Sequence, residues 1–257
     1  MQYILLQAIF LPLLLSPVAY FLGKKSGPNA ATWFSFGILA YCTALITLAS
    51  LSGTYEEHYP WTQQFGEFGL VLDGLASPFA IIIYVISTVV VLFSKPYMVA
   101  KLTAQYEEKM HTQKQVVGDG PTAMVESSSL KNYVNHQIGV YYALLLVMAM
   151  GMLGSVLATN LIEFYVFFEV MLIPGFFMIA LWGYEAKRRV ALLFFFWTHV
   201  GAVILLLGFL TIGFNAGSFN YADIHEHTIP HRLLALAAVA IIVGLGVKMA
   251  AFVVHVW

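Results

Sequence analysis

Long apolar runs alternate with short polar connections along the chain, a pattern that predicts membrane-spanning helices. Apolar runs of about 20 residues or more can be drawn at 2–22, 31–52, 75–98, 137–159, 161–183, 190–214 and 232–257. A helix rises about 1.5 Å per residue, so about 20 residues cross roughly 30 Å of hydrocarbon. Apolar positions do not alternate every second residue, which argues against a transmembrane barrel. We therefore expect an all-α integral membrane protein of about seven transmembrane helices.

The polar connections divide the chain into three parts. Residues 1–98 hold the first three helices, 99–136 form the one extended polar stretch, expected as a cytoplasmic loop, and 137–257 hold the last four helices. A very short turn at Thr159 and Asn160 predicts that the fourth and fifth helices form an antiparallel hairpin. Small residues share one face of the fourth helix and favour close helix packing there; they are Gly151, Gly154, Ser155 and Ala158.

The positions of lysine and arginine predict the orientation of the chain. With the N-terminus outside, Arg232 alone falls on the outer side, and one side collects Lys24, Lys25, Lys95, Lys101, Lys109, Lys114, Lys131, Lys187, Arg188 and Arg189. Such an excess marks the cytoplasmic side. No positive residue precedes the first apolar run, so we expect a retained helix and not a cleaved signal peptide. We expect a multi-pass protein of a prokaryotic plasma membrane or an equivalent energy-coupling membrane.

Composition excludes several other classes of protein. Hydrophobic residues make up 60% of the 257 residues and charged residues 10%, whereas soluble domains carry about 25% charged residues. The net charge of −1 offers no basic surface for nucleic acid. The single cysteine, Cys42, forms no disulfide framework within the chain, and His225, His227 and His231 are too loosely spaced to predict a metal site. We expect no metal and no cofactor in this chain.

Two ionisable residues at membrane depth are the candidates for function. Glu169 lies near the middle of the fifth helix, and Lys248 lies deep in the seventh, after Gly244 and Gly246. A charge in the bilayer centre costs about 3 kcal/mol or more, so such residues are functional candidates by default. Pro174 cannot donate to the carbonyl of Val170, which predicts a free acceptor and a hydrated break beside Glu169. The two glycines predict a loosened turn before Lys248.

Other polar residues extend this candidate site. Thr198 and His199 lie in the middle of the sixth helix, where an imidazole could relay protons between Glu169 and Lys248. His255 follows Lys248 by seven residues and shares its helix face. The alternative for Glu169 and Lys248 is a purely structural ion pair, although apolar pairs usually stabilise at least as well. The alternative for His199 is a histidine satisfied by a backbone carbonyl.

Two motifs resemble those of a known family. They are the segment from Asn160 to Pro174, which continues to Gly183, and the segment from Gly246 to Trp257. Both are similar to the antiporter-like subunits of respiratory complex I, most closely to subunit M, which is subunit 4 of mitochondrial NADH dehydrogenase. Asp73 and Gly74 before the third helix fit the same pattern.

The resemblance implies both an architecture and a role. The family has fourteen helices with two inverted five-helix repeats, and this chain corresponds to an N-terminal portion holding most of the first repeat. Glu169 and Lys248 match the family's glutamate on helix five and its lysine on a broken helix seven, the entry half of a proton path. A histidine like His255 lies nearby. The family commonly has proline just after that lysine, where Ala250 and Phe252 stand here.

The leading hypothesis is a proton-translocating, non-redox subunit of a complex I-like quinone oxidoreductase, not catalytic alone. The electron donor would be NADH, reduced F420 or ferredoxin. Implied partners are other membrane subunits, the lipid bilayer and, indirectly, a peripheral electron-transfer arm. A multisubunit sodium/proton antiporter or a membrane-bound hydrogenase would use the same glutamate and lysine. Different classes are a haem-binding cytochrome with His199 and His255 as axial ligands, and a structural scaffold.

Overall fold

The computed structural model describes residues 3–62, 64–117 and 123–251. The elements within them follow one another as α1 (Ile4–Ser26), α2 (Pro28–Leu51), β1 (Tyr55–Thr62), β2 (Gly66–Leu72), α3 (Ala76–Val117), α4 (Ala123–Leu157), α5 (Leu161–Val170), α6 (Leu172–Trp182), α7 (Lys187–Ala216), α8 (Tyr221–Glu226) and α9 (His231–Lys248). Seven helical segments in this part of the chain are long and apolar enough to cross a membrane, with α5 and α6 together forming one of them. The predicted helical, multi-pass architecture is confirmed.

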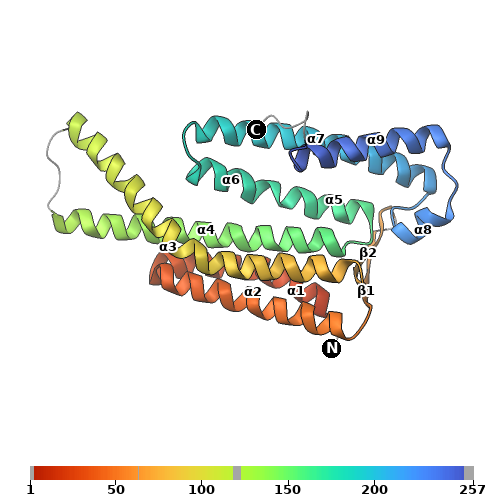
Figure 1. Ribbon diagram of the computed structural model, residues 1–257, viewed down its shortest axis with the longest axis horizontal. Coiled ribbons are helices and arrows are strands. Elements are labelled where there is room, and N and C mark those ends of the chain that lie inside the picture. The colour runs from red at the N-terminus through yellow and green to blue at the C-terminus, as the bar shows by residue number, and fades with distance from the viewer. Residues whose placement is uncertain (1–2, 63, 118–122, 252–257) are drawn as a thin grey trace.

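The helices form two groups on either side of α4 (Figure 1). α1, α2 and α3 lie on one side of α4, and α5 to α9 lie on the other. The first group encloses a core that includes the fully buried Tyr84 and Tyr142. Their hydroxyls donate to the backbone carbonyls of Ala8 and Val91, at 2.5 and 2.9 Å, so buried polar atoms are paired between helices. A second core joins α5 to α7.

The two ends of the bundle carry different structures. β1, β2, α8 and the α4–α5 turn gather at one end, and the far ends of α3 and α4 lie at the other (Figure 1). The lysine-rich end includes Lys101, whose Nζ lies 4.0 Å above the ring of Tyr184. Lys101 lies in the stretch 99–136 that links the third and fourth spans, and Tyr184 belongs to the connection between α6 and α7. Two connections predicted to lie on the same side of the membrane therefore meet at the same end of the bundle. That the hairpin end is the outer one stays a prediction.

The predicted loop at 99–136 is wrong as a description of its backbone, because α3 continues to Val117 and α4 already begins at Ala123. The rings of Tyr106 and Tyr133 pack 5.4 Å apart between these two extensions. The end of an apolar run marks where hydrocarbon ends and not where a helix ends. The segment includes good helix formers such as Lys101 and Glu108. The division into three parts stays a prediction.

An antiparallel hairpin of β1 and β2, absent from our sequence expectations, fills much of the connection between α2 and α3. Glu57 of β1 is buried, and its two carboxylate oxygens accept the N–H groups of Leu5 and Leu6, at 2.9 and 3.0 Å. The first N–H groups of a helix have no partner within it, and its N-terminus attracts negative charge. The hairpin thereby caps α1 from a distance in sequence.

The α4–α5 turn forms as the sequence predicts. Asn160 is the N-cap of α5, and its side-chain oxygen accepts the N–H groups of Ile162 and Glu163, at 2.8 and 3.4 Å. The small face of α4 lies against α5: a Cβ on Gly154 would come within 2.3 Å of the Phe167 ring. The predicted close packing through Gly154 is confirmed.

Candidate functional site

The fifth membrane span is interrupted in its middle. α5 ends at Val170, Met171 forms a turn, and α6 begins at Leu172. Pro174 follows within the first turn of α6, where its missing N–H leaves the Val170 carbonyl without its helical donor. The interruption falls beside Glu169, as the position of Pro174 predicts.

Lys248 reaches this interruption from another span. Its Nζ donates to the backbone carbonyl of Phe168 at 3.1 Å and lies 4.3 Å above the Phe168 ring. The lysine is half-buried. The sequence predicts a free acceptor at the Val170 carbonyl, but the carbonyl that Lys248 binds is that of Phe168. Both Val170 and Phe168 are adjacent to Glu169. A backbone carbonyl and an aromatic face are both groups with which a lysine cation can interact at membrane depth.

Glu169 binds His199 and not Lys248. The distance from Glu169 Oε2 to His199 Nδ1 is 3.2 Å, with 23% of the glutamate side chain and 48% of the histidine side chain exposed. Within the described part of the chain, Glu169 and Lys248 form no direct ion pair. The alternative of a purely structural ion pair between these two residues is therefore not supported by the structure. His199 is also stacked on Phe195, with ring centroids 6.0 Å apart.

The seventh span stops at Lys248 inside its apolar run. Met249 ends α9, and the N–H groups of Ala250 and Ala251 donate to the carbonyls of Val247 and Gly246, at 3.2 and 2.8 Å. This pair of bonds is the Schellman motif, which usually places glycine at the left-handed position. Here that residue is Ala250, at φ 51°, a conformation that a side chain disfavours by about 1–2 kcal/mol. The backbone is therefore held away from continuing the helix.

The predicted loosening at Gly244 and Gly246 is wrong, because both lie inside α9. Gly244 instead allows close packing: a Cβ there would come within 2.6 Å of the Gly201 carbonyl oxygen of α7. The break lies after Lys248, at a position that no glycine marks in the sequence. As the last residue of α9, Lys248 also sits at the negative end of the helix dipole.

The remaining predicted residues contribute less to this geometry. Thr198 is buried, but its hydroxyl donates within its own helix to the Phe194 carbonyl at 2.5 Å. Its place in a proton path stays a prediction. His255 lies outside the described residues, so its alignment with Lys248 also stays a prediction.

Glu163 is an acidic residue whose burial the sequence does not predict. One turn into α5, we would expect it to reach the membrane interface, yet it is only 1% exposed. Its Oε2 accepts the N–H of Gly69 on β2 at 3.2 Å. No sequence signal foretells this burial, because it depends on a hairpin that the apolar pattern does not indicate.

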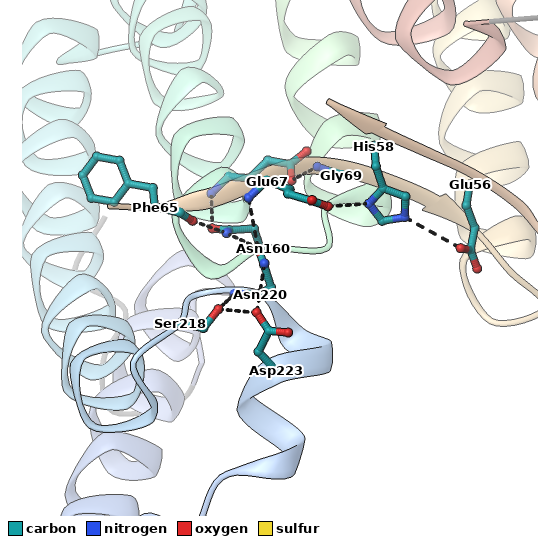
Figure 2. A network of polar contacts seen from close by, with 10 residues as sticks. Glu56, His58, Phe65, Glu67, Gly69, Asn160, Ser218, Asn220 and Asp223 are labelled. Atoms are coloured by element: carbon teal, nitrogen blue, oxygen red, sulfur yellow. Dashed lines mark hydrogen bonds and ion pairs between the residues drawn. The ribbon is translucent and has the colours of Figure 1, made fainter. Parts of the chain in front are cut away.

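A polar network joins the connections at the hairpin end (Figure 2). The Asn160 amide donates to the Phe65 carbonyl and to Asn220 Oδ1, at 2.6 and 2.8 Å. On β1, His58 lies 3.5 Å from Glu67 and 3.7 Å from Glu56. This network borders a cavity of about 900 Å³. The network is separate from the site around Glu169, which lies deeper in the span.

Tyr221 lines the same cavity. Tyr221 is 41% exposed, but desolvation of its phenol, and then the nearby Glu163 carboxyl, raise its pKa to about 12. The Tyr221 N–H donates to the Thr159 carbonyl at 2.9 Å, and the Thr159 N–H donates to the carbonyl of Gly69, whose own N–H donates to Glu163. The polar network at the hairpin end and the buried carboxyl of Glu163 are therefore neighbours.

The arrangement brings proton-exchanging groups of three spans to one helix interruption. The Glu169 carboxylate and the His199 imidazole lie within hydrogen-bonding distance, at 3.2 Å, so a proton can pass directly between them. Lys248 lies at the adjacent carbonyl, where its charge affects the energy of ionising Glu169. Irregular backbone at membrane depth, with ionisable groups at it, is typical of ion pathways.

The chain is similar to known membrane proteins in sequence. Residues 158–257 match the family described as NADH:quinone oxidoreductase/Mrp antiporter, TM. The chain is 25% identical over 228 residues to NAD(P)H-quinone oxidoreductase chain 4 1 of Synechococcus sp., covering 87% of this chain and 36% of that protein. It is 33% identical over 138 residues to NADH-quinone oxidoreductase subunit M of Pseudomonas aeruginosa, covering 49% and 27%. The chain thus spans well under half the length of these relatives.

Solved structures show the same fold. A chain of the Mrp complex from Dietzia sp. superimposes with a TM-score of 0.72 at 22% identity, covering 95% of this chain and 23% of that chain. A chain of respiratory complex I from Thermus thermophilus gives 0.68 at 20% identity, covering 95% and 44%. The resemblance expected from the two motifs is confirmed, and the fold is that of an antiporter-like subunit.

Proposed function

We propose that this chain, which is similar to the antiporter-like subunit M of complex I, is part of a proton-translocating membrane subunit. In this proposal the subunit couples proton movement to electron transfer from NADH, reduced F420 or ferredoxin to a quinone. It holds no redox centre, and it works with other membrane subunits and, indirectly, a peripheral electron-transfer arm. The observation that carries the proposal is the contact of Lys248 Nζ with the Phe168 carbonyl, one residue from Glu169.

This contact joins two interrupted spans through protonatable groups. Lys248 ends α9, and Phe168 stands at the interruption between α5 and α6. A proton arriving at Glu169 removes a negative charge next to the lysine, which weakens the hold on the lysine's own proton. Loss of that proton removes the charge that orients Nζ toward the carbonyl. Protonation and geometry are thereby linked, and a structural ion pair would not need either helix break.

Proton pumping by the assembled complex in vesicles tests the proposal. In Glu169→Gln we expect proton uptake coupled to quinone reduction to fall at least tenfold, because glutamine keeps the shape and cannot release a proton. The matched control is Glu226→Gln, since Glu226 is exposed on α8, away from the site. Unchanged pumping in a fully assembled Glu169→Gln complex would refute the role.

A subunit of a multisubunit sodium/proton antiporter is the second candidate, favoured by the TM-score of 0.72 with a chain of the Mrp complex. The same glutamate and lysine would then serve exchange without electron transfer. Purification of the complex from its native membrane separates the two. Co-purification of flavin or iron–sulfur subunits supports the oxidoreductase, and a complex without redox subunits supports the antiporter.

A further inference from the structure

Glu163 is a buried carboxyl that the proposed proton path does not use. It lies on the face of α5 that also carries Val166, Phe167 and Val170. One of its oxygens, Oε2, is held by the Gly69 N–H at 3.2 Å. The other, Oε1, is buried and has no hydrogen-bond partner among the described residues. Leaving a buried polar atom without a hydrogen-bond partner is unfavourable, so this oxygen is expected to bind a ligand.

A cavity of about 230 Å³ adjoins Glu163. Apart from Glu163 its lining is apolar: Phe10, Trp61, Phe68, Met150, Val166, Phe167 and Val170. A water molecule occupies about 30 Å³ in the liquid, so the cavity has room for several. It extends along α5 from Glu163 to Val170, and it faces α1, α4 and the hairpin. Glu169 contacts α7 and so faces a different side of α5.

Neither state of the carboxyl is satisfied by protein groups alone. An ionised carboxylate would be buried without a cation, which is expensive. A protonated carboxyl would need an acceptor for its O–H, and the apolar lining offers none. A water molecule that entered from the cavity would supply a donor to the first state and an acceptor to the second.

The titratable groups around Glu163 are few in the described part of the chain. α1 and α4 contribute only Phe10 and Met150 to the cavity. The hairpin contributes His58, whose Nδ1 would lie 3.0 Å from a Cβ on Gly69. α8 contributes the Tyr221 phenol, which interacts electrostatically with Glu163. His58 and Tyr221 both line the larger cavity at the hairpin end (Figure 2 shows His58 and Gly69).

We infer that Glu163 is a second proton-binding carboxyl, which exchanges its proton through water in the cavity with the hairpin end of the bundle. Uptake converts the carboxylate and a hydronium ion into the carboxylic acid and water, and release reverses this. The Gly69 N–H that holds the carboxyl belongs to β2, and the Gly69 carbonyl accepts the N–H of Thr159 at 3.1 Å. Thr159 and His58 both line the larger cavity at the hairpin end. This site is distinct from Glu169 because it faces other helices and contacts none of the groups around Lys248.

Infrared titration of the complete complex in vesicles tests this inference. The carbonyl stretch of a protonated carboxyl is separate from that of a carboxylate. We expect wild type to show such a band that titrates with pH and shifts in heavy water, Glu163→Gln to lose it, and Glu169→Gln to keep it. Glu163→Asp retains a carboxyl and should move the band to another frequency.

Two outcomes would overturn the inference. One is a set of protonated-carboxyl bands that is the same in wild type and Glu163→Gln at every pH. The other, which decides the matter if the glutamine variant does not assemble, is a Glu163→Asp spectrum that matches wild type. The bands do not depend on pumping, so this site and the proposed function can fail separately.

Discussion

Asn160 offers a sharp test of how the hairpin end is held together. The side chain is fully buried. Its oxygen caps α5 by accepting two N–H groups, and its amide donates to the Phe65 carbonyl and to Asn220 Oδ1, at 2.6 and 2.8 Å. Asn160→Ala removes all four bonds. The perturbation therefore separates a local role in the helix start from a long-range role in joining connections.

The expected magnitude follows from these bonds. Loss of an N-cap costs about 1 kcal/mol. The Phe65 carbonyl loses a buried donor, which adds about 1–3 kcal/mol. Asn220 Oδ1 still accepts from the Glu67 N–H at 3.4 Å, so it adds little. We expect Asn160→Ala to lower the free energy of unfolding by about 2–4 kcal/mol.

Reversible unfolding in mixed detergent micelles measures this change, and Asn160→Ser is the matched control. Serine keeps a cap acceptor and loses the two donated bonds, so it should be more stable than alanine by about 1 kcal/mol. Hydrogen exchange should also quicken at the Ile162 and Glu163 amides in the alanine variant only. If both variants unfold like wild type, the network in Figure 2 does not hold the hairpin end.

Three further predictions address the helix break, the packing and the pH dependence. Ala250→Gly should stabilise the end of α9 by about 1 kcal/mol and Ala250→Val should destabilise it, as measured by unfolding, because only glycine adopts positive φ freely; equal stabilities would argue against this break. Gly139→Val should prevent close packing of α4 on α1 and lower expression, because a Cβ at Gly139 would lie 2.5 Å from the Tyr20 carbonyl oxygen. Gly37→Ala should express like wild type, because a Cβ at Gly37 would meet no atom within 4 Å. The Tyr221 pKa of about 12 lies above its ordinary 10.0, so the contribution of Tyr221 to the free energy of unfolding is complete below pH 10 and is lost as pH rises toward 12. Tyr221→Phe should reduce this loss of stability between pH 10 and 12, and an unchanged pH dependence of unfolding would contradict the assignment.

The helices were predictable from the sequence because apolar length alone specifies a membrane span. Their ends were not, since α3 and α4 continue beyond the apolar runs as helices into residues 99–136. The hairpin was also missed. Its polar and aromatic residues are stabilised by contacts distant in sequence, such as the hydrogen bond that the Leu5 N–H donates to Glu57.

The candidate site was predictable in its membership and not in its pairing. Glu169, His199 and Lys248 stand out because ionisable groups in hydrocarbon are expensive. That Glu169 contacts His199, while Lys248 contacts a backbone carbonyl, depends on how α7 and α9 rotate against α5. The end of α9 could not be predicted either, because an alanine occupies the position where glycine would have signalled it.

The role of Lys248 in passing protons between the two interrupted spans can be tested by substituting Lys248→Met in the assembled complex. The quantity to measure is the ratio of protons translocated to electrons transferred. Methionine keeps an unbranched side chain and cannot carry a proton, so packing against Phe168 is preserved. We expect quinone reduction to continue while the ratio falls, because protons can no longer pass between the two interrupted spans. A Lys248→Met complex with the wild-type ratio would contradict this role of Lys248.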